Sequence, residues 1–137
     1  MNRLMVVLPM LALTASPNFA PPPGAINPQV TQANISTTIC DSGWIRTIRP
    51  QLSSASALKQ RQMKERNLPG RLSDYQEDYL IQLELGGHPT DLRNIWLQPI
   101  AQAELKNQVE FGLNRAVCAY RMPLVEAQHL IRDPRNW

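Results

Sequence analysis

Hydrophobic and polar positions alternate most clearly between residues 78 and 85. Apolar side chains stand at Tyr79, Ile81, Leu83 and Leu85, and polar ones at Asp78, Gln82 and Glu84. A period of two is typical of a strand with one buried face. Gly86 and Gly87 end this strand, and a second short strand is predicted over 94–97, before Pro99. The pattern therefore predicts two strands joined by a glycine-containing loop.

A helical pattern follows from Ile100 to about Tyr120. One predicted apolar stripe has a spacing of four, through Leu105, Val109, Leu113 and Val117, and the neighbouring stripe holds Asn107, Glu110, Phe111, Asn114 and Cys118. Further helices are predicted from Ser53 or Ser54 to about Asn67, and from Pro123 to near Asp133. Weaker patterns predict a short helix over 29–40 and a short strand over 44–48. The fold class expected is α+β, a mainly helical small domain.

The first twenty residues have the organisation of an export signal. A short basic start precedes an apolar run over 4–13, which is too short to span a bilayer. The alternatives are an uncleaved anchor and a buried helix, and Pro17 and the prolines of 21–23 disfavour the helix. We expect a signal peptide over 1–20, a proline-rich linker over 21–28 and one folded domain over 29–137.

Two cysteines, Cys40 and Cys118, are the complete set in this chain. In an exported protein an isolated pair favours a disulfide, and two unpaired core thiols are the alternative. We therefore expect a secreted or periplasmic protein, with no membrane association in its mature form.

Basic residues are concentrated in one part of the chain. The formal net charge is +3, yet residues 41–73 alone carry seven Lys and Arg residues against two acidic residues. Such side chains contact the phosphates of nucleic acids, although a solvated helix face is the plain alternative. With one later arginine, the candidate nucleic-acid-binding residues are Arg46, Arg49, Lys59, Arg61, Lys64, Arg66, Arg71 and Arg93.

The stretch from Tyr75 to Trp96, YQEDYLIQLELGGHPTDLRNIW, resembles a secreted bacterial family of HNH-type (ββα-metal) nucleases. Members of that family run Y-E-x-D-H-L-I-x-L-E-L-G-G-x-P-x-D-x-R-N-L-W. Shorter similar pieces lie upstream and downstream, so that the resemblance covers most of the chain after about Gly24. It implies a ββα-metal finger over 78–118 and a metal-dependent endonuclease that acts on DNA or RNA.

The resemblance also implies roles for individual residues. Asp78 and Asn114 are the expected metal ligands, and Asn94 is expected to orient the loop. Carboxylate and amide oxygens suit one divalent ion, most readily Mg²⁺ or Mn²⁺. In such nucleases the metal neutralises the scissile phosphate, while a histidine on the first strand takes a proton from the attacking water.

Tyr79 stands where that catalytic histidine belongs. A phenol has an ordinary pKa near 10 and is a weak base at neutral pH. His88 is the histidine nearest the motif, and it either approaches the metal or lies exposed in its loop. The bland alternatives are a core aromatic for Tyr79, a local cap or ion pair for Asp78, a turn residue for Asn94 and a solvated helix position for Asn114.

Three functions follow as hypotheses. The first is an exported metal-dependent endonuclease, with weakened activity because losing a general base typically costs 10² to 10⁴ in rate. The second is a catalytically inactive, nuclease-derived module that binds nucleic acid. The third is an exported partner-binding protein with no nucleic-acid role, and the sequence leaves the choice open.

Overall fold

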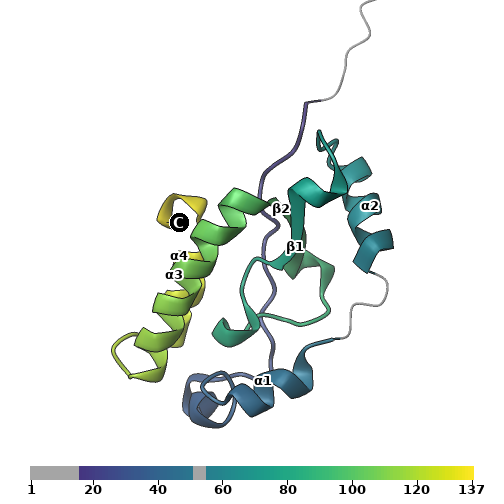
Figure 1. Ribbon diagram of the computed structural model, residues 1–137. Coiled ribbons are helices and arrows are strands. Elements are labelled where there is room, and N and C mark those ends of the chain that lie inside the picture. The colour runs from purple at the N-terminus through teal and green to yellow at the C-terminus, as the bar shows by residue number, and fades with distance from the viewer. Residues whose placement is uncertain (1–15, 51–54) are drawn as a thin grey trace, which may run out of the picture.

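The computed structural model describes residues 16–50 and 55–137. A two-stranded antiparallel sheet of β1 (Tyr75–Tyr79) and β2 (Ile95–Pro99) lies between α2 (Ala55–Glu65) on one side and α3 (Ile100–Cys118) on the other (Figure 1). The last helix, α4 (Leu124–Ile131), packs along α3, and α1 (Ser42–Ile48) lies below the loop of the hairpin. The expected α+β class is thus confirmed, while an HNH-type finger stays a prediction.

Short 3-10 turns connect these elements. They are η1 (Gln32–Thr37), η2 (Leu72–Asp74), η3 (Leu83–Leu85), η4 (Leu92–Asn94) and η5 (Pro134–Asn136). The predicted helix over 29–40 is the turn η1, which buries Ile35. Its threonines and β-branched residues disfavour a longer regular helix.

The predicted strand over 78–85 is wrong beyond Tyr79. In the hairpin, Tyr79 pairs with Ile95, the first residue of β2, so no partner strand remains for the residues that follow. The backbone N–H and C=O of Ile81 instead bond to the side chain of Asn94. Ile81, Leu83 and Leu85 are still fully buried, although in a bend and in η3. The apolar pattern therefore indicates that these side chains are buried, although the segment is not a strand.

The predicted strand over 44–48 is also wrong, because this segment forms α1. Asp41 caps the helix by accepting a hydrogen bond from the N–H of Gly43 at 2.8 Å. Ile45 and Ile48 then lie on one side of the helix and contribute to a small apolar cluster. Five residues are too few to distinguish the period of a strand from that of a helix. The cap that Asp41 provides favours the helix.

The three longer helices lie where the periodicity placed them. α2 ends at Glu65, α3 spans Ile100–Cys118, and α4 spans Leu124–Ile131. The predicted stripe of α3 is only partly right, since Leu113 and Val117 are buried whereas Leu105 is 56% exposed. Lys106, not Leu105, faces the hairpin. The proposed caps Ser53 and Ser54 lie outside the described residues.

The main core lies between η1, η3, α3 and α4, with the disulfide at its edge. Its buried members are Val30, Ile35, Ile39, Ile81, Leu85, Leu113, Val117, Leu124, Ala127 and Ile131. Cys40 and Cys118 form the predicted disulfide, with an S–S distance of 2.03 Å. Within the described part of the chain, no helix has the length and apolar character needed to cross a membrane.

The proline-rich segment over 21–28 packs on the domain. Gly24 N–H donates to the carbonyl of Arg93 at 2.8 Å, and Asn27 N–H donates to that of Gly86 at 2.8 Å. Ala25 and Asn27 are buried. Packing therefore begins upstream of residue 29, the expected start of the domain. Residues 1–15 lie outside the described residues, so the signal peptide stays a prediction.

The disulfide closes a long loop, since its cysteines are 78 positions apart in the sequence. In the chain-entropy model such a cross-link stabilises the fold by about 4 kcal/mol. We expect the double variant Cys40→Ser, Cys118→Ser to lose roughly that free energy of unfolding in urea titrations. Adding a reductant should destabilise the wild-type protein and leave the double variant unchanged. Equal stability of oxidised wild-type protein and variant would contradict this prediction.

Candidate functional site

A buried lysine joins the hairpin to α3. The ammonium of Lys106 donates to Asp78 Oδ2 at 3.2 Å, to the carbonyl of Tyr79 at 2.6 Å and to Glu110 Oε1. Lys106 is 0% exposed. The ring centroid of Trp137 lies 5.7 Å from Nζ, so an aromatic face adds to the shielding of this charge from water.

Local structure explains why these groups meet. Asp78 pairs with Trp96 across the hairpin, and its side chain points from β1 toward α3. Lys106 and Glu110 are four residues apart on α3, so they share one face of the helix. Gln82 completes the group by donating to Asp78 Oδ1 at 2.8 Å. We call Asp78, Gln82, Lys106 and Glu110 the Lys106 cluster.

Two carboxyl groups share this one ammonium. Burial raises the pKa of Glu110 to about 8, since the loss of solvation outweighs the attraction of Lys106, and Asp78 adds repulsion. Glu110 therefore holds a proton at neutral pH. A single carboxylate then balances the buried lysine, and Glu110 is a poor proton acceptor below that pKa.

Asn94 holds the loop that leaves the hairpin. It is fully buried, its Oδ1 accepts from Ile81 N–H at 2.9 Å, and its Nδ2 donates to the carbonyls of Ile81 at 2.9 Å and His88 at 3.1 Å. Gly87 allows this close approach, because a Cβ there would lie 1.7 Å from the carbonyl oxygen of Ile81. This geometry agrees with the loop-orienting role expected for Asn94, and it does not fit an ordinary turn residue.

Tyr79 and His88 both make contacts within this loop. The hydroxyl of Tyr79 donates to the carbonyl of Pro89 at 3.0 Å, and its ring packs with Ile45 and Leu83. Burial raises the pKa of this phenol. His88 Nδ1 accepts from the N–H groups of Thr90 at 3.2 Å and Asp91 at 3.1 Å. These contacts favour a neutral phenol for Tyr79, and they give the side chain of His88 the role of capping the turn.

The two expected metal ligands have separate partners. Both oxygens of Asp78 already accept hydrogen bonds within the Lys106 cluster, and its side chain is 4% exposed. Asn114 Nδ2 donates to the carbonyl of Glu84 at 2.8 Å and to that of Ile39 at 3.4 Å. Among residues 16–50 and 55–137, no three His, Cys, Asp or Glu side chains are grouped to hold a metal. In this arrangement the oxygen atoms around Lys106 suit its ammonium group better than they suit Mg²⁺ or Mn²⁺. The metal site stays a prediction.

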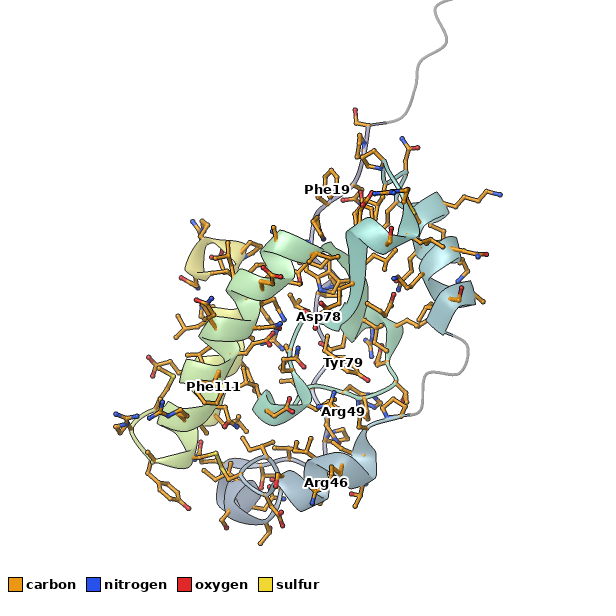
Figure 2. The ribbon with its side chains drawn as sticks, in the orientation of Figure 1. Phe19, Arg46, Arg49, Asp78, Tyr79 and Phe111 are labelled. Atoms are coloured by element: carbon orange, nitrogen blue, oxygen red, sulfur yellow. A yellow bond between two sulfur atoms is a disulfide. The ribbon has the colours of Figure 1, made fainter. Side chains whose placement is uncertain are left out.

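A basic groove opens between α1 and the C-terminal end of α3. It has a volume of about 650 Å³, and four arginines line it, Arg46, Arg49, Arg115 and Arg121. A second hollow of about 340 Å³ continues from it, because both are lined by Arg49, Glu84 and Asn114. The second hollow is also lined by Gln82, Asn107, Glu110 and Phe111. We call the two hollows together the arginine groove. Figure 2 shows Arg46 on α1, Arg49 directly after that helix, and Phe111 on α3.

The predicted basic residues are divided between two parts of the molecule. Arg46 and Arg49 line the arginine groove, whereas the others lie on or after α2, or in η4, and contact neighbouring groups. Their contacts are Lys59 with the Tyr75 carbonyl, Arg61 with Glu65, Arg66 with the Ala20 carbonyl and the Trp96 ring, Arg71 with Asp74, and Arg93 with Asp91. Lys64 is an exposed residue of α2.

Sequence reasoning missed Lys106, Arg115 and Arg121, and gave Glu110 no role. A lysine four residues before a glutamate is a visible signal, but such pairs normally lie on exposed helix surfaces. Arg115 and Arg121 stand outside the basic segment of the sequence. Only the fold, which places the end of α3 across the groove from α1, brings them near Arg46 and Arg49.

Comparison with known proteins finds no match among protein-family models, curated proteins or solved structures. The resemblance to HNH-type nucleases is therefore still a prediction.

The pKa of Glu110 gives a stability prediction. Because that pKa is raised above its ordinary value of 4.5 to about 8, the folded state binds the proton more tightly, and stability must fall as pH rises through this interval. Glu77, whose pKa burial raises to about 7, adds to the fall. We expect the wild-type free energy of unfolding to drop by roughly 3 to 6 kcal/mol between about pH 5 and 8, and Glu110→Gln to reduce the slope to the part that Glu77 contributes.

Urea titrations across this pH range measure the effect. Glu104→Gln, a change at an exposed carboxyl on the same helix, is the matched control and should keep the wild-type slope. An identical slope in wild-type protein and Glu110→Gln would show that Glu110 carries its charge in the folded protein.

Proposed function

We propose that this protein binds nucleic acid in the arginine groove, as a nuclease-derived module with lost or weakened hydrolysis. The observation that carries the proposal is the convergence of four arginines on one groove, two from α1 and the residue directly after it, and two from the end of α3 and the turn after it. The Cys40–Cys118 disulfide lines the same groove and ties its two walls together.

The chemistry of the groove suits a phosphate backbone. Guanidinium groups bind phosphate through two parallel hydrogen bonds, and Asn114 adds a polar amide to the wall. Arg49 lies 2.8 Å from Glu84, but the two side chains are 47% and 39% exposed. Such exposed pairs contribute little, so a phosphate can compete with Glu84 for Arg49.

Three observations favour binding over hydrolysis. The phenol of Tyr79 donates to Pro89 and has a raised pKa, which makes it a poor base. Asp78 is engaged by Lys106 and Gln82. Glu110, a carboxyl that lines the groove, holds its proton at neutral pH. None of these three side chains, Asp78, Tyr79 and Glu110, is therefore suited to accept a proton from water.

The location of the protein belongs to the same proposal. Structural disulfides persist in oxidising compartments, and Cys40 and Cys118 are paired. This pairing supports the expected secreted or periplasmic location. The nucleic acid that a protein meets there comes from outside the cell or from lysed cells.

Charge-removing variants test the groove. We expect Arg46→Gln with Arg121→Gln to weaken binding of a labelled oligonucleotide in anisotropy titrations, and to reduce the slope of log K against log salt by about 0.7 to 0.9 for each lost phosphate contact. Lys64→Gln with Arg71→Gln removes the same charge from the α2 region and should change both quantities much less. A larger effect of the α2 pair would overturn this assignment.

Metal-dependent hydrolysis is the second candidate, and the hydrogen bonds of Asn94 favour it because they match the role expected in a ββα-metal finger. We expect wild-type protein to give no chelator-sensitive cleavage of plasmid, single-stranded DNA or RNA with Mg²⁺ or Mn²⁺. Tyr79→His restores the expected base, and cleavage gained with unchanged affinity would support a module that lost catalysis. Tyr79→Phe is the matched control, since it removes the hydroxyl without adding an imidazole.

Chelator-sensitive cleavage by wild-type protein at micromolar concentration would instead establish the endonuclease. An absence of nucleic-acid binding at low salt would reject both candidates and leave the exported partner-binding protein as the remaining hypothesis.

A further inference from the structure

We propose that the ligand of the arginine groove is single-stranded nucleic acid, with one base stacked on Phe111 and the adjoining phosphates on the arginines. This inference rests on the proposed function and narrows it to one substrate class. The argument starts from Phe111, which is 65% exposed although it is a large aromatic residue on the longest helix.

Packing does not account for Phe111. The buried side of α3 is formed by Ala103, Lys106, Glu110, Leu113 and Val117, and Phe111 lies off this stripe. Its ring lines the second hollow of the groove, together with Arg49 and Asn114. An exposed aromatic face beside phosphate-binding side chains is the arrangement by which proteins hold unpaired bases.

Arg115 adds to this platform. Its guanidinium carbon lies 5.6 Å from the ring centroid of Phe111, one helical turn away on α3. The cation–π contact restrains the ring at the groove and places a positive charge next to it. A base on the free face of Phe111 would therefore have Arg115 and Arg49 nearby for its phosphates.

Polar groups of the second hollow suit the edge of a base. Gln82, Asn107 and Asn114 bring side-chain amides, and the protonated carboxyl of Glu110 is both a donor and an acceptor. Gln82, Asn114 and Glu110 already have protein partners, so the remaining atoms of these groups would pair with the hydrogen-bonding edge of a nucleobase. In a duplex that edge is paired and both faces of the base are stacked, so the base reaches Phe111 only from a single strand.

Anisotropy titrations with a labelled single-stranded DNA of about 20 nucleotides, and with the same strand annealed to its complement, test the inference. We expect the single strand to bind about tenfold more tightly. Phe111→Leu, which keeps an apolar side chain without the ring, should weaken single-strand binding about tenfold and barely affect the duplex. Leu105→Ala, at a residue of α3 that is 56% exposed, is the matched control and should leave both affinities unchanged.

Phe111→Trp gives a direct readout of stacking. It should retain the affinity of the wild-type protein and show quenching of the added tryptophan emission when the single strand binds. Equal binding of both DNA forms, with no effect of Phe111→Leu, would overturn the stacking proposal. If Arg46→Gln with Arg121→Gln still weakened binding in that case, the groove itself would stand. A protein that bound neither form would overturn both proposals.

Discussion

The burial of Lys106 is the interaction on which the arrangement of this domain depends. Desolvating an ammonium group costs several kcal/mol, and removing one partner of a buried ion pair typically destabilises a protein by about 3 to 5 kcal/mol. Here Asp78 compensates the charge, and Glu110 and the carbonyl of Tyr79 accept further hydrogen bonds from the ammonium. Because these groups belong to β1 and α3, the helix is fixed against the hairpin in one register. The position of every side chain that α3 presents to the groove follows from that contact.

The groove needs a second constraint, which the disulfide supplies. Cys40 immediately precedes the cap of α1, and Cys118 is the last residue of α3, so the bond joins the two walls where the arginines lie. Asn114 links the same helix to η3 through the carbonyl of Glu84. Four arginines gather there and Glu84 pairs with one of them, so the lining carries more positive than negative charge. This charge is the physical reason for proposing a polyanionic ligand between α1 and α3.

The elements that sequence predicted well are those whose pattern is long or whose ends are marked. The helices α3 and α4 and the strand β2 lie close to their predicted positions, and the cysteine pairing is confirmed. The strand over 78–85 was wrong because the side chain of Asn94, a long-range partner, takes the hydrogen bonds of Ile81. Lys106 was not predicted as a site residue because lysines are rarely buried. Its partners Asp78 and Tyr79 come from another element, β1. Arg115 and Arg121 join the site only through tertiary packing.

The proposal of binding without hydrolysis rests on contacts that also stabilise the fold, since Asp78, Tyr79 and His88 are all engaged by neighbouring protein groups. The central claim is that nucleic acid lies between α1 and α3. Photo-cross-linking of a single strand that carries 4-thiothymidine, followed by mass spectrometry of the cross-linked peptides, tests this most directly. Binding in the arginine groove predicts cross-links in the peptides that contain α1 and residues 111–121. Cross-links confined to α2 and the residues that follow it would contradict it.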